Sequence, residues 1–190
     1  MLHERKETAS AAATTALSVR DAIETDAEAV RHLAESFGFI GAPAVASIEA
    51  RIRQYIADKS YLLVVAELDG APVGYAFAQD FGPGLRVDFS TGRLHDVFVL
   101  PTARRQGVGR ALINAVSAWA HSRPCPLVLD WQAPANAVGF YESFSFKADR
   151  IGDLPQFPAF CIDTRKPAPL HIDVVTSAVG LNHGAFGINA

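Results

Sequence analysis

The residues of this chain best suited to binding a charged ligand form the run Arg-Arg-Gln-Gly-Val-Gly-Arg at positions 104–110. Glycines at 107 and 109 remove side chains that would shield main-chain N–H groups. The run stands between an apolar stretch at 94–100, expected to be a strand, and one at 111–120, expected to be a helix. The first turn of a helix has unpartnered N–H groups and the positive end of the macrodipole. The run therefore predicts a backbone site for phosphate or pyrophosphate.

Two other phosphate-binding motifs fit this run poorly. A P-loop needs Gly-Lys-Ser/Thr after its glycines, whereas positions 109–112 read Gly-Arg-Ala-Leu. A dinucleotide-binding fingerprint needs a third glycine where Leu112 stands, and it usually lies in an early strand-helix-strand unit. A binder of a different phosphate ligand stays open as an alternative.

The spacing Arg-x-x-Gly-x-Gly at 104–109, directly after the expected strand, resembles the acyl-CoA pyrophosphate loop of the GNAT superfamily of N-acyltransferases. A second match is Ala-x-x-Phe-Tyr-Glu at 137–142, which is similar to a signature of the same family and is followed by Phe146. The opening segment 17–30 is similar to the first strand and helix of that family. The resemblance covers roughly residues 17–165.

This resemblance implies an α+β fold, called a three-layer α/β/α sandwich in other schemes. Its central sheet is mixed and largely antiparallel, with one splayed parallel strand pair. The pattern of the sequence agrees with it, since Asp69-Gly70 is a hairpin signal between two β-rich runs and apolar residues recur at helical spacing after Asp26, the expected cap, and after Pro43. The expected elements are helices at 26–37 (closed by Gly38 and Gly41), 45–56 and 111–121, and strands at 61–67, 72–79, 93–100 and 127–131, with a break at 81–84.

Length and charge indicate one domain without a general attraction to nucleic acid. A chain of 190 residues is long enough for one well-filled core and short for two domains. We expect an unstructured tail at 1–15, an N-acetyltransferase domain at 16–166 and an extension at 167–190 that could support a homodimer. The net charge of −3 gives no general attraction to nucleic acid.

The cysteines and the hydropathy pattern bear on the compartment. Cys125 and Cys161 lie far apart, without a CxxC or Cys/His cluster, so we expect reduced thiols with no disulfide and no metal. The chain has neither a long apolar run nor an apolar signal core at its N-terminus. We therefore expect a cytoplasmic protein that does not associate with membranes.

The resemblance implies acetyl-CoA as co-substrate, with its pantetheine arm in the gap between the splayed strands. Many family members carry an asparagine that contacts pantetheine where this chain has Pro134; Asn136, two residues later, could cap the next helix instead. A glutamate at either loop glycine should abolish CoA binding and leave the fold largely intact. The expected cofactor-binding residues are Val97, Phe98, Val99, Arg104, Arg105, Gln106, Gly107, Val108, Gly109, Arg110, Asn136 and Tyr141.

Three side chains are candidates for catalysis. Tyr141 stands where the family has a general acid that donates to the departing thiolate, and its alternative role is core packing beside Phe140. The base could be His95, Asp96 or a chain of waters. Adjacent residues of a regular strand point to opposite faces, so only one of the two side chains could face the acceptor unless a bulge intervenes. In polyamine acetyltransferases of the superfamily an acidic pair stands here, and His95 replaces its first member.

The function implied is transfer of an acetyl group from acetyl-CoA to a primary amine, of a small molecule, by direct attack in a ternary complex. A protein N-terminal or lysine acetyltransferase and a non-catalytic acyl-CoA-binding regulatory module stay open. The first two helices and the loop at 81–91 should shape the acceptor site. Asp80, Asp88 and Asp96 would suit a cationic amine.

Overall fold

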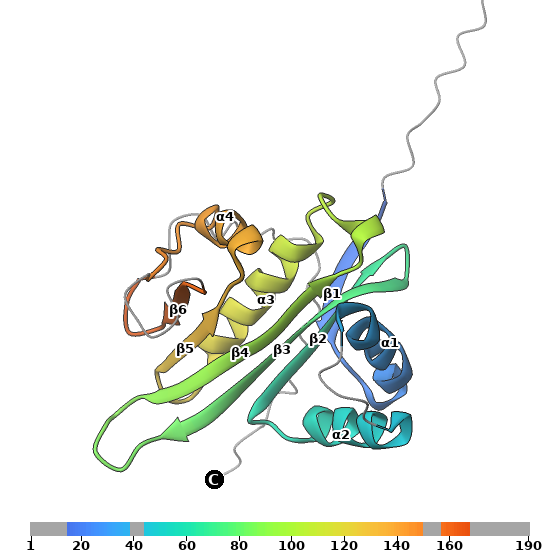
Figure 1. Ribbon diagram of the computed structural model, residues 1–190. Helices are drawn as coiled ribbons and strands as arrows, with labels where there is room; N and C mark the ends of the chain where they lie inside the picture. Colours follow the sequence, from blue (N-terminus) through green and yellow to red (C-terminus); the bar gives the residue numbers. More distant parts are fainter. Residues whose placement is uncertain (1–14, 39–43, 150–156, 168–190) are drawn as a thin grey trace, which may run out of the picture.

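The computed structural model describes residues 15–38, 44–149 and 157–167 (Figure 1). Apart from residues 15 and 167, the expected N-terminal tail and C-terminal extension lie outside these ranges, as do Gly41 and Pro43. One six-stranded sheet has its strands in chain order, and every neighbouring pair is antiparallel except the parallel pair β4–β5. The strands are β1 (Leu17–Asp21), β2 (Tyr61–Leu68), β3 (Ala71–Pro83), β4 (Ser90–Val99), β5 (Leu127–Gln132) and β6 (Ala159–Asp163).

Helices cover both faces of the sheet, which confirms the expected three layers. In Figure 1, α1 (Ala27–Phe37) and α2 (Val45–Ala57) lie on one side, and α3 (Val108–Ser122) lies on the other with the short α4 (Val138–Glu142). Three single turns of 3₁₀-helix precede α1, α3 and α4, at Glu24–Asp26, Pro101–Ala103 and Ala135–Ala137. No described helix is long and apolar enough to cross a membrane.

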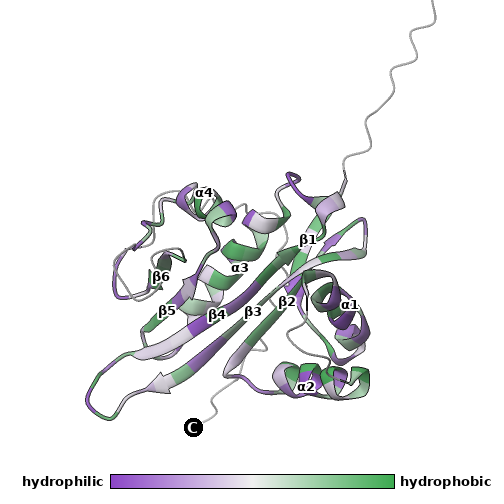
Figure 2. Ribbon diagram, in the orientation of Figure 1, coloured by the Kyte–Doolittle hydropathy of each residue, from purple (hydrophilic) through white to green (hydrophobic). Residues whose placement is uncertain are grey.

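Two separate hydrophobic cores result from this layering. Alternate residues of the central strands face α3 on one side and α1 with α2 on the other, so both faces of β2 and β3 carry apolar side chains. Figure 2 shows hydrophobic residues along the central strands and on the helices that cover them. Leu112, Ile113 and Val116 of α3 are fully buried against one face. Val30 and Leu33 of α1 pack on the opposite face.

The parallel strands β4 and β5 separate along their length. Ser90–Arg93 pair with Leu127–Asp130, and beyond these residues β4 runs on to Val99 beside β3 while β5 runs on to Gln132 beside β6. The edge of β4 that faces β5 therefore has no ladder partner from Leu94 onward. This is the splayed pair that the resemblance implied.

Three local expectations differ from the structure. β3 does not break at 81–84 but runs to Pro83, which pairs with Ser90, because Gly82 at φ 79° absorbs an irregularity in the ladder. Asp26 stands just before α1, but its carboxylate bonds to Arg20 and to the amide of Ile23 instead of capping that helix. The edge strand β6 was not predicted, since its five residues are too few for a clear pattern.

A buried ion pair joins β3 to the residue that follows α3. The carboxylate of Asp80, 7% exposed, accepts bonds from Arg123 Nε at 2.9 Å and from the amide of Gly82 at 2.8 Å. Arg123 also donates to the carbonyl of Lys59 at 2.9 Å. Asp80 is thus a structural residue that joins β3 to the end of α3, and it is not placed to recognise an acceptor.

Replacing Arg123 by Met should lower the free energy of unfolding by about 2–3 kcal/mol, because the buried carboxylate of Asp80 loses its charged partner. Urea denaturation measures the change. The control is Arg53→Met, which breaks an exposed pair with Glu49 and should change the free energy by less than about 1 kcal/mol. Equal losses in both variants would contradict this account of Asp80.

Candidate active site

The loop before α3 has the geometry of an anion site. Gly107 takes φ 85°, a left-handed conformation that favours glycine, and it is the residue before the first turn of the helix. No side chain caps this end of α3. The amides of Val108, Gly109 and Arg110 are in the first turn, where an α-helix leaves N–H groups without intrahelical acceptors. These N–H groups can donate hydrogen bonds to a diphosphate.

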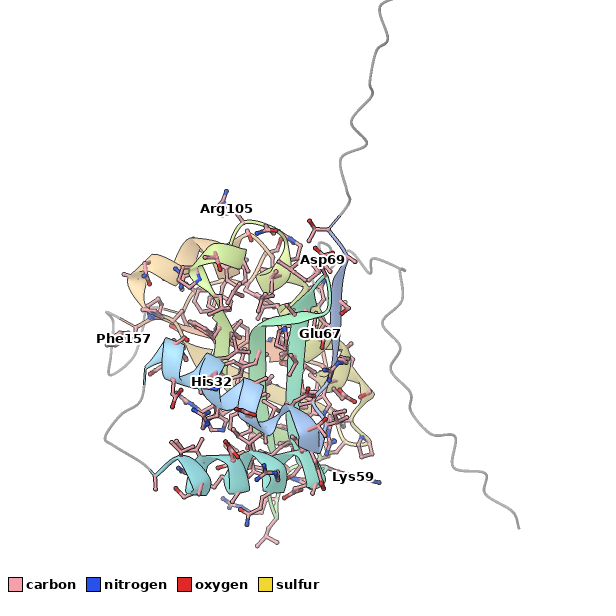
Figure 3. The ribbon with its side chains drawn as sticks, turned by 90° about the vertical axis from the view of Figure 1, so that its right-hand side faces the viewer. His32, Lys59, Glu67, Asp69, Arg105 and Phe157 are labelled. Carbon is pink, nitrogen blue, oxygen red and sulfur yellow. The ribbon has the colours of Figure 1, made fainter. Side chains whose placement is uncertain are left out.

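Four exposed polar side chains surround these amides. Two of them donate hydrogen bonds to main-chain carbonyl groups just before the glycines. Arg104 Nε donates to the carbonyl of Val99 at 3.2 Å, and Gln106 Nε2 donates to that of Thr102 at 3.2 Å. The guanidinium of Arg110 lies over the ring of Phe144 at 4.5 Å. Arg105, at φ 65°, extends outward from the tip of the loop (Figure 3). The sequence-predicted cationic rim is therefore present, with Arg105 the outermost member.

The two glycines of the loop differ in their surroundings. A Cβ at Gly107 would have Leu17 Cδ2 as its nearest heavy atom, at 3.7 Å, so space is available there. A Cβ at Gly109 would lie 3.1 Å from the ring of Phe140. Gly109 thus allows α3 to approach α4, and substituting it would disturb packing as well as ligand binding. The expectation that a glutamate leaves the fold largely intact applies only to Gly107.

The end of β4 presents main-chain groups to the gap between β4 and β5. The amide of Leu100 donates to Val73 at 2.9 Å, on the β3 side. Because amides alternate along a strand, those of Val97 and Val99 face the gap and that of Phe98 faces β3. The ring of Phe98 is buried and stacks on Phe37, with centroids 5.3 Å apart. Of the three predicted residues, Phe98 therefore has a packing role, and the two valines have amides available to a ligand.

Tyr141 lies on α4, on the α3 side of the sheet. It is 8% exposed, and its ring packs against Trp131 and Phe160 with centroids 5.2 and 5.3 Å away. Burial raises the pKa of Tyr141 to about 12, so the phenol keeps its proton at neutral pH. A protonated phenol can donate a hydrogen bond to a developing thiolate. The burial fits the core-packing role equally well.

Tyr141→Phe separates these two roles, because it keeps the ring and removes only the hydroxyl. If the phenol is the acid, kcat should fall by up to about 100-fold, the low end for general acids, since a thiolate with a pKa near 8.5 leaves readily. Stopped-flow and steady-state thiol release measure this loss. An unchanged kcat with an unchanged melting temperature would mean that the hydroxyl has no catalytic role and that Tyr141 serves only in packing.

The predicted pantetheine residue Asn136 lies in the 3₁₀ turn before α4 and is exposed. It does not cap α4, because the residue before that helix is Ala137 and no side-chain cap bond is formed there. The proposed cap is therefore wrong. The side chain of Asn136 is left facing solvent near the end of β5.

A β-bulge in β4 decides how the two candidate bases are placed. Asp96 lies opposite Phe77 and Leu94 lies opposite Ala78, so His95 is an extra residue on β4. On a regular strand Leu94 and Asp96 would share a face. Instead Leu94 packs in the core under α3, whereas Asp96 faces the side of α1 and α2, where the ring of His95 stacks on Phe77 at 5.1 Å. The bulge thus places both bases on one face, unlike a regular strand.

Asp96 lies in the wall of a cavity of about 310 Å³ between the sheet and the two helices α1 and α2, which cover this face of the sheet in Figure 3. Five aliphatic side chains of α1, α2 and β2 and the rings of Tyr55, Tyr75 and Phe77 line it. Arg51 of α2 is its one lining guanidinium, and Asp96 is its one lining carboxylate, among the described residues. No residue of 81–91 lines the cavity, so its described walls do not include the loop expected to shape the acceptor site.

Burial and one hydrogen bond set the protonation of the bases. Desolvation raises the pKa of Asp96, and the hydroxyl of Tyr75, which donates to Asp96 Oδ2 at 3.2 Å, acts in the opposite direction. Desolvation lowers the pKa of His95, and the charge of Asp96 acts in the opposite direction by raising it. At neutral pH His95 is therefore neutral and able to accept a proton, although its residue is exposed at the surface.

Sequence reasoning missed Tyr75, Arg51, Tyr55 and Phe77 as site residues. Each looks like an ordinary strand or helix residue in its own segment, and only the packing of α2 on β3 brings them together. The spacing of Ile48, Arg51, Ile52 and Tyr55 does place Arg51 on the apolar side of α2. Arg51 is itself exposed, and its place beside the buried Ile48 and Ile52 was the available signal.

Comparison with known proteins agrees with this geometry. A model of the acetyltransferase (GNAT) family matches residues 27–146. Aminoglycoside N(6')-acetyltransferase type 1 of Klebsiella aerogenes is 33% identical over 76 residues, which are 37% of this chain and 47% of that protein. "Uncharacterized N-acetyltransferase MJ1207" of Methanocaldococcus jannaschii is 29% identical over 89 residues, 46% of this chain and 39% of that protein. The match thus spans about half the length of these relatives, or less.

Solved structures share the fold at low sequence identity. Glucosamine-6-phosphate N-acetyltransferase from Arabidopsis thaliana has a TM-score of 0.61 and 17% identity, over 72% of this chain and 95% of that one. The Salmonella typhimurium protein yncA, solved with its cofactor acetyl-CoA, has a TM-score of 0.58 and 18% identity, over 80% of this chain and 97% of that one. Since the family model spans more than half of the chain and these structures share its fold, the protein belongs to the acetyltransferase (GNAT) family.

Proposed function

We propose that the protein transfers the acetyl group of acetyl-CoA to a primary amine of a small molecule, by direct attack in a ternary complex. The observation that carries the proposal is the double role of β4. Its main-chain amides at Val97 and Val99 face the gap toward β5, and its side chain at Asp96 lines the cavity under α1 and α2. The proposed cofactor site and the proposed acceptor site are therefore separated only by the width of β4.

The chemistry assigned to these groups is amide formation from a thioester. The loop amides and the arginine rim hold the diphosphate, and the amides of β4 hold the pantetheine arm. An alkyl amine has a pKa near 10 and needs to lose a proton to attack, and Asp96, or His95 beside it, is placed to accept that proton. The amine nitrogen bonds to the acetyl carbon, the C–S bond breaks, and CoA leaves as a thiolate that Tyr141 stabilises.

The relatives support the reaction class. The named curated relatives are N-acetyltransferases, and one solved neighbour holds acetyl-CoA. The cavity supports a small molecule, because α1, α2 and the sheet form its described walls and its volume of about 310 Å³ suits a small ligand.

Thiol release from acetyl-CoA with a panel of polyamines, aminoglycosides, amino acids and short peptides tests the proposal. Release with a small amine, together with an acetylated product in mass spectrometry, is the expected result. Release only with peptides would replace the small molecule by a protein acceptor. Tight binding of acetyl-CoA with no release from any acceptor class would favour a non-catalytic binding module.

A further inference from the structure

The cavity under α1 and α2 is lined by apolar side chains, one carboxylate and one guanidinium. A simple amine would leave the guanidinium without an anionic partner. The body of the cavity is apolar, with the rings of Tyr55 and Phe77 in contact, their centroids 4.8 Å apart. One carboxylate, Asp96, enters from β4, and one guanidinium, Arg51, enters from α2. A ligand that fills this space should be apolar in its body and carry both a positive and a negative end.

Among the described residues, Arg51 differs from the nearby Arg31 and Arg53 in forming no ion pair with an acidic side chain. Arg31 pairs with Glu35 and Glu49, and Arg53 pairs with Glu49. In the part of the chain that the structure describes, the side chain of Arg51 makes one hydrogen bond, from Nε to the carbonyl of Ser47 at 3.4 Å. Its terminal nitrogens are therefore available to an anionic group of a ligand, and a carboxylate is the planar partner that a guanidinium binds best.

The same charges disfavour a polycation. An aminoglycoside or a polyamine would bring several ammonium groups to a cavity whose described lining offers one carboxylate. A second ammonium group inside the cavity would have no described carboxylate of its own, and the guanidinium of Arg51 would repel it. A volume of about 310 Å³ is also at the small end for ligand pockets, whose range is about 300–1,000 Å³.

Resting on the proposed function, we infer that the acceptor is the α-amino group of an amino acid with an apolar side chain. Its amine lies at Asp96, its carboxylate binds Arg51, and its side chain packs against Tyr55 and Phe77. The carboxylate of the substrate also fixes the position of the adjacent amine, because both are attached to the same carbon atom.

The test compares matched acceptors that differ only in the carboxylate. L-phenylalanine and L-leucine are set against phenethylamine and 3-methylbutylamine, with kanamycin and spermidine as polycations. The expected kcat/KM is higher for the two amino acids than for their decarboxylated counterparts by about 10- to 100-fold, the range for a hydrogen bond to a charged group. Equal or higher values for the decarboxylated amines, or a preference for kanamycin or spermidine, would overturn the inference and leave the proposed function standing.

Variants of Arg51 identify the residue responsible. Arg51→Gln should lower kcat/KM for the amino acids toward that of the decarboxylated amines and leave the amines unchanged. Arg53→Gln is the matched control, because Arg53 is an exposed arginine of the same helix that does not line the cavity, and it should change neither. An equal loss for both kinds of acceptor in Arg51→Gln would mean a structural effect and would overturn the assignment. If no acceptor at all is acetylated although acetyl-CoA binds, the proposed function itself fails.

Discussion

Replacing Asp96 by Asn is expected to lower kcat/KM for the acceptor by about 10²- to 10⁴-fold, the usual contribution of a general base. The amide keeps the size of the carboxylate but cannot take a proton from the amine. Acetyl-CoA should bind with unchanged affinity, because the cofactor groups of β4 are main-chain amides. Steady-state thiol release and calorimetric titration measure the two quantities.

Asp88→Asn is the matched control for this variant, since Asp88 is exposed in the hairpin between β3 and β4 and does not line the cavity. It should retain full activity. Equal losses in the two variants, or an Asp96→Asn enzyme that stays within threefold of the original, would remove Asp96 from the mechanism.

The pH profile distinguishes Asp96 from His95. The hydroxyl of Tyr75 stabilises the ionised form of Asp96 and so lowers the pKa of that carboxyl. Tyr75→Phe removes this effect, the pKa rises, and the acidic limb of the kcat/KM profile should move to higher pH. With Asp96→Asn the same limb should disappear. An acidic limb that persists in Asp96→Asn and is lost in His95→Gln would assign the base to His95.

Gly107→Glu should weaken acetyl-CoA binding by at least about 100-fold, because a carboxylate at the first turn of α3 meets the diphosphate and like charges in contact cost several kcal/mol. The strain of a side chain at φ 85° should lower the free energy of unfolding by about 1–2 kcal/mol. Calorimetry with CoA and thermal denaturation measure both effects.

Gly82→Glu is the control for backbone strain. Gly82 has φ 79°, and a Cβ there would meet no heavy atom within 4 Å. It lies near the start of β4, whereas the loop follows the end of that strand. This variant should lose similar stability and keep its affinity for CoA. An unchanged affinity in a folded Gly107→Glu protein would exclude the loop as the cofactor site.

The sequence predicted best the features that are local in the chain. The loop at 104–110 depends on glycine spacing between one strand and the next helix, and the structure places it as expected. The hairpin at Asp69-Gly70 is also local, and both residues take positive φ. The mixed sheet and the splayed pair came from the resemblance, and the strand pairing confirms them.

The parts that sequence reasoning missed depend on contacts between distant segments. The bulge at His95 is defined by which residues of β3 lie opposite its neighbours, and nothing within β4 itself marks it. Tyr75 lies 21 positions before Asp96, and its hydroxyl reaches the carboxylate only because the two strands pair. The role of Asp80 likewise requires Arg123, which is 43 positions away.

The extra residue in β4 also bears on how such sites change during evolution. Because the pairing is regular at residues 92–94 and 96–99 of β4, losing this one codon would leave Asp96 opposite Phe77 and Leu94 opposite Ala78. The core under α3 and the acidic group of the cavity would keep their places, and only the imidazole would go. A single in-frame insertion or deletion can therefore add or remove a second proton acceptor here, without any need for compensating changes elsewhere in the sheet.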